Sequence, residues 1–223
     1  MNLVKHMEFF DPTTVRDSVH VIGVGAIGSI VVEQLVRLGF EHIHIYDFDT
    51  VTDYNVTNQL YRTIDIGEKK TTALIDMCKA INPEIKITEH ATGWSENNII
   101  SGYVFLCVDS IELRLKIAQH YALSTNIKAM FDFRMRLTDA QHYAANWDND
   151  KSKSNFIKTM NFTDAEAKDA TPVSACGTTL SVSPTIRMIV SCGMANFLNF
   201  LKEPTTLKSM VIADPFKFEI LAI

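Results

Sequence analysis

Residues 21–32, VIGVGAIGSIVV, are the stretch that decides the fold. Glycines at Gly23, Gly25 and Gly28 give it the spacing G-x-G-x-x-G. In such a loop the first glycine permits a tight turn, the second lets the backbone approach a phosphate, and the third lets helix and strand pack closely. The helix that follows offers unpaired N–H groups and the positive end of its dipole to an anion. The stretch therefore predicts a phosphate-binding loop between a strand and a helix.

The flanking residues agree with this prediction. Residues 18–24 are apolar and β-branched, as in a strand, and apolar residues from Ile30 to Leu38 recur at helical spacing before Gly39. Residues 42–46 (HIHIY) predict the next strand. Asp47 ends that strand, 19 residues after Gly28, where a carboxylate can accept hydrogen bonds from ribose hydroxyls. This is the start of a doubly wound α/β sheet with a nucleotide site.

The rest of the chain continues the α/β pattern. We expect helices at 69–81, 111–122 and 185–201, strands at 84–89, 103–108, 128–133, 141–146, 208–213 and 216–221, and a polar, mobile excursion with one short helix at 148–172. The fold class is α/β: a Rossmann-like doubly wound, mostly parallel sheet with antiparallel additions in the C-terminal half. We expect one domain over residues 1–223, with a nucleotide-binding half at about 17–125 and a C-terminal sheet extension, crossover segment and helix at about 126–223.

Composition excludes several classes of protein. The 223 residues carry a net charge of -5 without a cluster of lysine or arginine, which argues against nucleic acid or an anionic membrane as partner. No apolar run is long enough for a membrane span, and the N-terminus is not that of a secreted protein. The four cysteines form no C-x-x-C pair, which argues against a thiolate zinc site and fits a reducing compartment. We expect a cytoplasmic protein.

A polar stretch after the second strand bears on which nucleotide is bound. It contains Asp49, Asn55, Asn58, Gln59, Arg62 and Lys70. Amides can bind ribose and phosphate oxygens, and the two cations can neutralise phosphate charge, so the set favours ATP over NAD. Taken singly, Lys70 could be a solvated residue at a helix start and Arg62 a surface ion pair.

Asp109 follows the buried strand expected at 103–108. The carboxyl ends of parallel strands are where an open α/β sheet binds ligands, and a carboxylate there can hold Mg²⁺ against phosphates. The alternative is that Asp109 caps the helix expected to begin near Ile111.

Five motifs in order, GVGAIGS, DFDTV, NVTNQLYR, DIGEKK and CVDSIELR, resemble the ThiF/MoeB family, the bacterial relatives of ubiquitin-activating enzymes. The resemblance covers the first half of the chain well and the second half loosely. The matching positions are Gly23, Gly25, Ala26, Gly28, Ser29, Asp47, Asp49, Val51, Asn55, Gln59, Gly67, Lys70, Asp109 and Arg114.

The resemblance implies an ATP-dependent adenylyltransferase that is commonly a homodimer. The C-terminal carboxylate of a ubiquitin-like or sulfur-carrier protein, or of a peptide, attacks the α-phosphorus of Mg-ATP to give an acyl-adenylate and pyrophosphate. By this resemblance Asp109 binds Mg²⁺, Lys70 contacts the phosphates, Asp47 holds the ribose and Asn55 contacts the nucleotide.

Several positions depart from the family pattern. Ala26 stands where a further glycine is usual, and Asn58 replaces the arginine of N-L-N-R-Q. An amide supplies neither the charge nor the fork of a guanidinium, although Arg62 could partly substitute. Cys176 matches a family cysteine that bonds the activated protein, but no histidine or lysine lies close in sequence to lower its pKa, so it could be a simple loop thiol.

Other interpretations remain open at this point. A Rossmann NAD(P) oxidoreductase would also carry the glycine loop, and Asn58 is the best argument for an inactive nucleotide-binding scaffold. His42 and His44 share a strand face without an evident third ligand. Cys107 and Cys192 are expected in the core, and the helix at 185–201 is expected to be core or a dimer surface. The acceptor could be a sulfur carrier, a ubiquitin-like modifier, a peptide antibiotic precursor or a small carboxylate.

Overall fold

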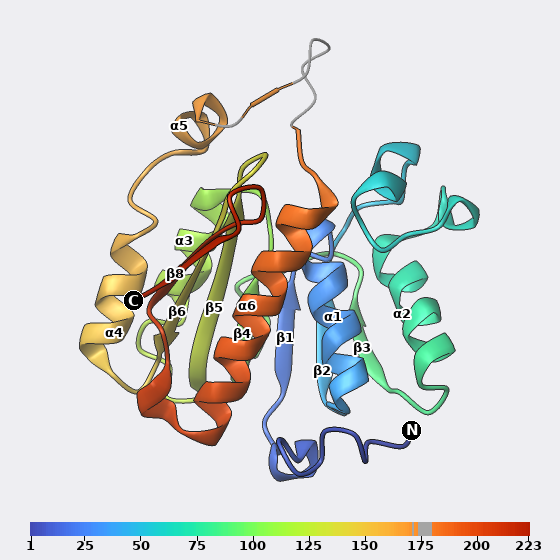
Figure 1. The fold of residues 1–223 in the computed structure, drawn as a ribbon, viewed down its shortest axis with the longest axis horizontal. Coiled ribbons are helices and arrows are strands. Elements are labelled where there is room, and N and C mark those ends of the chain that lie inside the picture. The colour runs from blue at the N-terminus through green and yellow to red at the C-terminus, as the bar shows by residue number, and fades with distance from the viewer. Residues whose placement is uncertain (171, 174–179) are drawn as a thin grey trace.

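One sheet of eight strands organises the computed structural model, which describes residues 1–170, 172–173 and 180–223 (Figure 1). The strand order is β3-β2-β1-β4-β5-β6-β7-β8. The first five are parallel: β1 (Val19–Ile22), β2 (Ile43–Tyr46), β3 (Ile87–His90), β4 (Gly102–Leu106) and β5 (Ile127–Met135). The others join antiparallel: β6 (Ala140–Asn146), β7 (Met210–Asp214) and β8 (Glu219–Ala222). The predicted fold class is confirmed.

The strand order reverses between β1 and β4. The chain runs outward from β1 to β2 and β3 and then returns to place β4 on the other side of β1. Ile22, the last residue of β1, pairs in register with Tyr46 of β2 and with Leu106 of β4. The loops that follow these three strands therefore leave the sheet at one edge, at the switch point where such sheets bind ligands.

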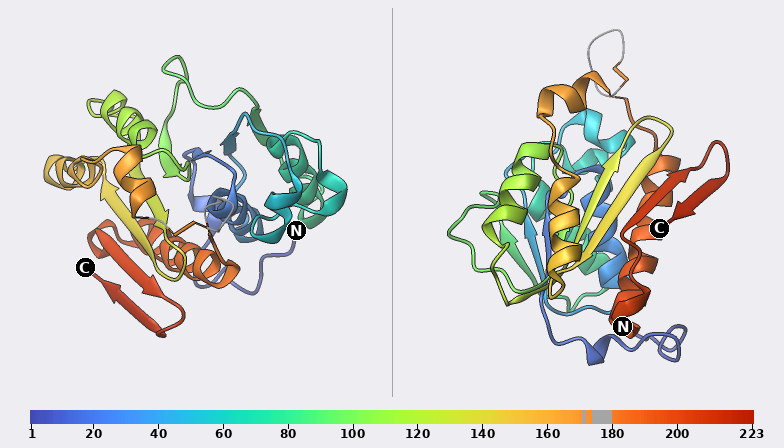
Figure 2. Two further views of the ribbon diagram at one scale, coloured as in Figure 1. Left: turned by 90° about the horizontal axis from the view of Figure 1, so that it is seen from above. Right: turned by 90° about the vertical axis from the view of Figure 1, so that its left-hand side faces the viewer.

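Helices cover both faces of the sheet, as Figures 1 and 2 show. One face carries α1 (Ala26–Leu38), α2 (Lys70–Ile81) and α6 (Ser183–Lys202), and the other carries α3 (Ile111–His120) and α4 (Asp150–Lys158). The short helix α5 (Asp164–Asp169) follows α4. Every residue of β1 and of β4 is buried, as expected for parallel strands that are covered on both faces. Among the described residues, none of the helices has the length and apolar character needed to cross a membrane.

Helix α1 begins earlier than its apolar periodicity predicts. The spacing starts at Ile30, whereas the helix starts at Ala26 with Gly25 as its N-cap. Ile27, Gly28 and Ser29 are buried in its first turn. The loop is therefore only three residues long, 23–25, and the helix N-terminus lies against it. At the other end Gly39, with φ of 89°, closes the helix as predicted.

The polar excursion contains two helices, α4 and α5, where the sequence analysis expected one. Asn149 caps α4 by accepting a hydrogen bond from the Ser152 N–H. Thr163 and Glu166 form a capping box around the first turn of α5. Both capping signals, an asparagine and a T-x-x-E pattern, are present in the sequence. The segment contains few apolar residues, so apolar periodicity does not predict its helices.

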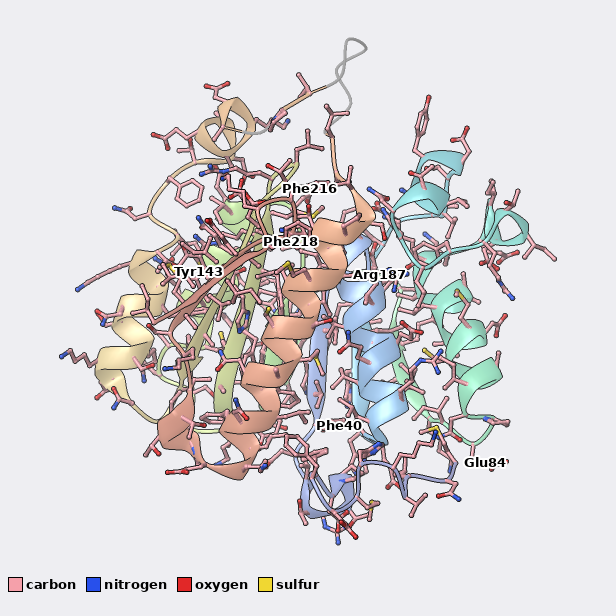
Figure 3. All side chains as sticks on the ribbon, in the orientation of Figure 1. Phe40, Glu84, Tyr143, Arg187, Phe216 and Phe218 are labelled. Atoms are coloured by element: carbon pink, nitrogen blue, oxygen red, sulfur yellow. The ribbon has the colours of Figure 1, made fainter. Side chains whose placement is uncertain are left out.

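Helix α6 packs its apolar side chains into the core on the α1 side of the sheet. Ile186, Ile189, Val190, Met194 and Phe197 are all buried there. This confirms the expectation of a core helix, and these side chains are not available as a dimer surface. One group of exposed apolar side chains lies on the C-terminal hairpin, where Phe216 and Phe218 belong to the turn between β7 and β8 (Figure 3).

Candidate functional site

Two of the three loop glycines are required by close backbone packing. Gly23 has φ of +87°, and a Cβ there would lie 2.8 Å from the backbone of Cys107 and Val108. A Cβ on Gly28 would lie 1.9 Å from the Gly23 carbonyl oxygen. The space beside Gly25 is different, because among the described residues a Cβ there would meet only the side-chain nitrogen of Gln59, at 4.0 Å. The second glycine thus borders open space, as a position for close backbone approach to a ligand would.

Asp47 ties the glycine loop to the end of β2. Its Oδ2 accepts a hydrogen bond from the Val24 N–H at 2.8 Å, and its Oδ1 accepts one from the Asp49 N–H at 2.9 Å. The Tyr61 hydroxyl donates to the Val24 carbonyl at 2.7 Å, and burial raises the pKa of this phenol. Val24 is therefore held on both its N–H and its carbonyl, which fixes the position of the loop between β1 and α1.

Lys70 and Asp49 form an ion pair at the same edge. The Lys70 Nζ lies 2.7 Å from Asp49 Oδ2, and the Lys70 N–H donates to the Asp49 carbonyl at 3.0 Å. The lysine side chain is 8% exposed and the aspartate side chain 49% exposed. A buried ammonium needs a partner, and this one has a carboxylate that faces solvent on its other side. The alternative that Lys70 is a solvated residue at a helix start is wrong, because the side chain is buried.

Two buried amide oxygens near the loop have no hydrogen-bond partner among the described residues. Asn58 donates from Nδ2 to the Ser181 hydroxyl, immediately before α6. In the described part of the chain, however, Asn58 Oδ1 and Gln59 Oε1 are buried without a hydrogen bond. Buried acceptors are almost always paired, so two adjacent orphans mark a place where the donors of a ligand could bind.

Asn55 and Arg62 are both committed to local turns. Asn55 Oδ1 accepts hydrogen bonds from the Thr52 N–H at 2.9 Å and the Thr52 hydroxyl at 3.1 Å. Arg62 donates from Nε and Nη2 to the two carboxylate oxygens of Asp65, at 3.0 and 2.7 Å. These hydrogen bonds from Arg62 lower the pKa of Asp65. Arg62 is thus the surface ion pair that the sequence analysis weighed as the alternative.

Asp109 is exposed just beyond β4, and within the residues that the structure describes no hydrogen bond or ion pair engages its carboxylate. The cap of α3 is Ser110, whose hydroxyl accepts from the Leu113 N–H at 3.0 Å. The alternative that Asp109 caps this helix is therefore wrong. The carboxylate is left free at the switch point of the sheet.

Arg114, five residues further on, is a buried clamp. Its guanidinium donates to the Val108 carbonyl, to the Phe133 carbonyl at 2.6 Å and to the carboxylate of Asp132. Asp132 is fully buried and also accepts from Arg134 Nε at 2.6 Å. Arg114 occupies a motif position in the sequence, but its role as a clamp is not evident there, because Asp132 and Phe133 come from β5.

Cys176 lies outside the described residues, so its predicted role stays a prediction. The other three cysteines are described as free thiols. Burial raises the pKa of Cys78 to about 12 and also raises the pKa of Cys107 and of Cys192. These three thiols are protonated at neutral pH and are poor nucleophiles. Cys107 packs against the main core as expected.

A stack of three histidines escaped the sequence analysis. His20, His44 and His90 lie on β1, β2 and β3, with ring centroids 4.4 Å apart for the first pair and 5.7 Å for the second. Burial, together with His44 and His90, lowers the pKa of His20 to about 3. No group of three or more His, Cys, Asp or Glu side chains in the described part of the chain has the arrangement to hold a metal ion. The stack becomes evident from the pairing of β1, β2 and β3, because the three histidines are far apart in sequence. His42 precedes β2 and is not part of the stack.

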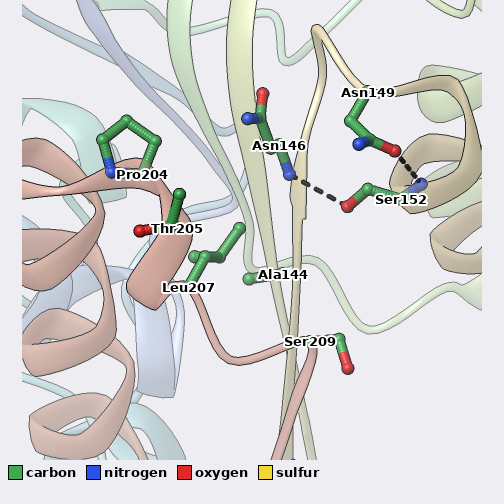
Figure 4. A pocket seen from close by; sticks show the side chains of 8 residues that line it. All are labelled: Ala144, Asn146, Asn149, Ser152, Pro204, Thr205, Leu207 and Ser209. Carbon is green, nitrogen blue, oxygen red and sulfur yellow. Dashed lines mark hydrogen bonds between the residues drawn. The ribbon is translucent and has the colours of Figure 1, made fainter.

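A pocket of about 240 Å³ lies at the opposite edge of the sheet (Figure 4). Its position follows from the register, because Asn146 pairs with Ala129 near the start of β5. Neutral side chains line it: Ala144, Asn146, Asn149, Ser152, Pro204, Thr205, Leu207 and Ser209. Asn149 and Ser152 already form hydrogen bonds within the protein. It contains none of the predicted site residues.

The fold and the loop define a class of protein. A glycine loop leads into a helix at the switch point of a doubly wound sheet, with a free carboxylate and a paired lysine beside it. This is the arrangement of a nucleotide-binding α/β protein.

Comparison with known proteins places the chain more narrowly: it belongs to the ThiF family, whose model matches residues 13–222. Ubiquitin-like modifier-activating enzyme 5 from Oryza sativa subsp. japonica is 27% identical over 124 residues, which is 47% of this chain and 30% of that protein. The protein of the same name from Dictyostelium discoideum is 31% identical over 119 residues, 46% of this chain and 31% of the relative. Each match spans less than a third of the relative.

Solved structures share the fold over most of the chain. E. coli MccB with ATP superposes with a TM-score of 0.69 at 16% identity, covering 93% of this chain and 63% of that one. PaaA gives a TM-score of 0.67 at 14% identity, covering 93% of this chain and 64% of that one. The microcin C7 biosynthetic enzyme MccB has also been solved in complex with N-formylated MccA.

Proposed function

We propose that the protein is a Mg-ATP-dependent adenylyltransferase that activates the C-terminal carboxylate of a small protein or peptide as an acyl-adenylate, with release of pyrophosphate. The observation that carries this proposal is the edge formed by the loops after β1, β2 and β4. That edge combines an open glycine, two orphaned amide oxygens, a buried lysine and a free carboxylate.

The residues present fit ATP. The open backbone at Gly25 and the N-terminus of α1 suit a phosphate, with Ala26 as the first helical residue. The amide oxygens of Asn58 and Gln59 suit the hydroxyl or amino donors of a nucleoside. Asp47 and Asp49 lie at the end of β2, where a Rossmann acid holds ribose, and Asn55 lies in the turn that follows.

Lys70 is the residue we assign to charge neutralisation. Its ammonium is already desolvated and is held by Asp49, so it meets a phosphate without reorganisation. In-line attack by a carboxylate on a phosphorus asks mainly for positioning and charge stabilisation. Arg62 is the second cation near this edge, and engaging the nucleotide would require it to leave Asp65.

Asp109 is the residue we assign to Mg²⁺. Oxygen ligands suit this ion, which keeps several waters and is bound through one or two carboxylates plus phosphates. When bound, the ion would neutralise phosphate charge as a Lewis acid. Asp109 is exposed, and its carboxylate has no hydrogen bond or ion pair within the part of the chain that the structure describes, which suits it to this role.

Relatives and structural neighbours support the acceptor class. The relatives are named as activating enzymes of ubiquitin-like modifiers, and MccB has been solved with the MccA peptide.

We also propose a cytoplasmic homodimer. The exposed apolar hairpin supports the dimer, because Phe218 is 92% exposed beside half-exposed Phe216, Ile220 and Leu221. Sedimentation of the wild type and of a Phe218→Ser, Ile220→Ser variant tests the dimer, which should be lost in the variant.

Exchange of labelled pyrophosphate into ATP tests the proposed activity. The protein is incubated with Mg-ATP and a panel of acceptors: a sulfur carrier ending in Gly-Gly, a ubiquitin-like protein and a peptide with a free C-terminus. Exchange should require the acceptor, vanish when its C-terminus is amidated, and vanish in Asp109→Ala. ATP binding without exchange for any acceptor would favour an inactive scaffold, for which neutral Asn58 is the argument. Tight NAD binding without ATP binding would overturn the proposal.

A further inference from the structure

The first turn of α3, which begins right after Asp109, is capped by a residue more than fifty positions away. Asp164 Oδ1 accepts hydrogen bonds from the Ile111 N–H at 2.6 Å and the Glu112 N–H at 3.2 Å, and Asp164 Oδ2 accepts from the Ser110 hydroxyl at 2.7 Å. Backbone N–H groups in a first helical turn have no partner within the helix, so one carboxylate satisfies two of them.

Asp164 is itself well held. It is the first residue of α5, which is closed by the Thr163 and Glu166 capping box, and its own N–H donates to Glu112 Oε1 at 3.4 Å. Burial alone would raise the pKa of Asp164, but the hydrogen bonds from Ser110, Glu112 and Ile111 lower it. The carboxylate therefore stays charged at neutral pH, which suits the positive end of the α3 dipole.

A second anchor holds the same segment against the sheet. Arg134 donates to the Thr159 carbonyl and to the Thr159 hydroxyl, both at 2.8 Å, and its Nε donates to buried Asp132. Asp132 in turn accepts from Arg114, which clamps the Val108 carbonyl. The residues on both sides of Asp109 are thus tied to the ends of the segment 159–164: Ser110 directly to Asp164, and Val108 to Thr159 through Arg114, Asp132 and Arg134.

We propose that Asp164 is a positioning residue for Asp109: the segment 159–164 is a strap that fixes the first turn of α3 and thereby holds the Asp109 carboxylate at the switch point of the sheet. This rests on the assignment of Asp109 to Mg²⁺ in the proposed function. Asp109 has no side-chain partner in the described part of the chain, so its place depends on the backbone at 108 and 110. The hydrogen bonds that Asp164 accepts place the start of α5 against the N-terminal end of α3.

The test compares three variants of the full chain. Asp164→Ala removes the cap. Asp164→Asn keeps an oxygen for the two N–H groups but removes the charge. Glu166→Ala is the matched control, because it breaks the α5 capping box without touching α3. The first measurement is amide hydrogen exchange at Ile111 and Glu112, which should accelerate in Asp164→Ala and stay at wild-type rates in Asp164→Asn and Glu166→Ala.

The second measurement is the Mg²⁺ concentration that half-maximally tightens binding of a fluorescent ATP analogue. It should rise about tenfold in Asp164→Ala, the effect typical of losing an outer residue that orients a metal ligand. Asp164→Asn should restore the wild-type value, whereas binding without Mg²⁺ should be equal in all three variants. An unchanged Mg²⁺ requirement in Asp164→Ala would overturn the inference, as would an equal rise in Glu166→Ala or in Asp164→Asn. If the wild type shows no Mg²⁺ dependence, the proposed function itself fails.

Discussion

The two edges of the parallel sheet carry polar side chains of different character. At the carboxyl edge lie a free carboxylate, a buried ion pair and two orphaned amide oxygens around an open glycine. At the amino edge a pocket of about 240 Å³ is lined by neutral groups, several of which already bond within the protein. The amino-edge pocket is lined in part by groups that form hydrogen bonds with one another, whereas at the carboxyl edge Asn58 Oδ1 and Gln59 Oε1 are buried without a partner among the described residues.

This difference indicates that polar groups without hydrogen-bond partners, and not the presence of a pocket, identify the candidate site. A buried acceptor without a donor lowers the stability of the fold. A loop position that has no room for a Cβ accepts only glycine for steric reasons. Single substitutions can therefore separate residues that the fold requires from residues that the site requires.

Substitution of Gly28 should mainly reduce the stability of the fold, whereas substitution of Gly25 should mainly reduce ATP affinity. Gly28→Ala drives a Cβ into the Gly23 carbonyl at 1.9 Å and should lower the free energy of unfolding by about 3 kcal/mol or more. Gly25→Ala faces open space and should cost about 1 kcal/mol or less while weakening ATP binding about tenfold. Urea unfolding and ATP titration measure the two effects. Equal loss of stability in both variants would contradict the distinction.

Two neighbouring lysines should differ in their effect on the nucleotide. Lys70 is buried and paired with Asp49, whereas Lys69 is exposed and donates to the Phe48 carbonyl at 3.1 Å. Lys70→Ala should weaken ATP binding about tenfold, the cost of losing a charged hydrogen-bond donor. Lys69→Ala should leave ATP affinity within about twofold of wild type. If both variants weaken binding alike, the effect is general electrostatics and the assignment of Lys70 is wrong.

Lowering the pH should reduce the free energy of unfolding through His142, which lies outside the candidate site. Burial lowers the pKa of His142 to about 4, and the ring sits between the Asp132 carbonyl and the Asn196 amide. Because the unfolded chain takes up this proton below about pH 6.5, the stabilisation is complete above that pH and is lost as pH falls toward 4. From pH 7 to pH 5 the free energy of unfolding should fall by about 1–2 kcal/mol for this group.

His142→Gln keeps a donor and an acceptor but does not titrate. Its urea unfolding should show a shallower loss of stability between pH 7 and pH 5, and its ATP affinity at pH 7 should match wild type. An identical pH dependence in this variant would mean that other groups, such as His20, account for the whole effect.

The glycine loop and the doubly wound, mostly parallel sheet could be predicted because their signals are local. Glycine spacing, apolar periodicity and an acid at the end of β2 all lie within one short stretch of sequence. The two helices of the excursion were underestimated because caps, not apolar periodicity, define α4 and α5. Their sequences carry little of the apolar repeat on which the prediction depended.

The commitments of individual side chains could not be predicted, because their partners are distant in sequence. Arg114 meets Asp132, and Ser110 meets Asp164, only through packing of separate elements. The sequence does not indicate that Arg62 forms a local ion pair with Asp65 whereas Lys70 is buried and pairs with Asp49. The predicted roles of these residues toward ATP remain predictions.

Calorimetric titration with ATP, with and without Mg²⁺, and with NAD tests the central claim most directly. It should be run on the wild type, on Asp109→Asn and on Asp148→Asn, a matched exposed aspartate near the opposite edge of the sheet. The account predicts that ATP binds and NAD does not, and that Mg²⁺ tightens ATP binding about tenfold in the wild type and in Asp148→Asn but not in Asp109→Asn. Tight binding of NAD without ATP, or an intact Mg²⁺ effect in Asp109→Asn, would contradict it.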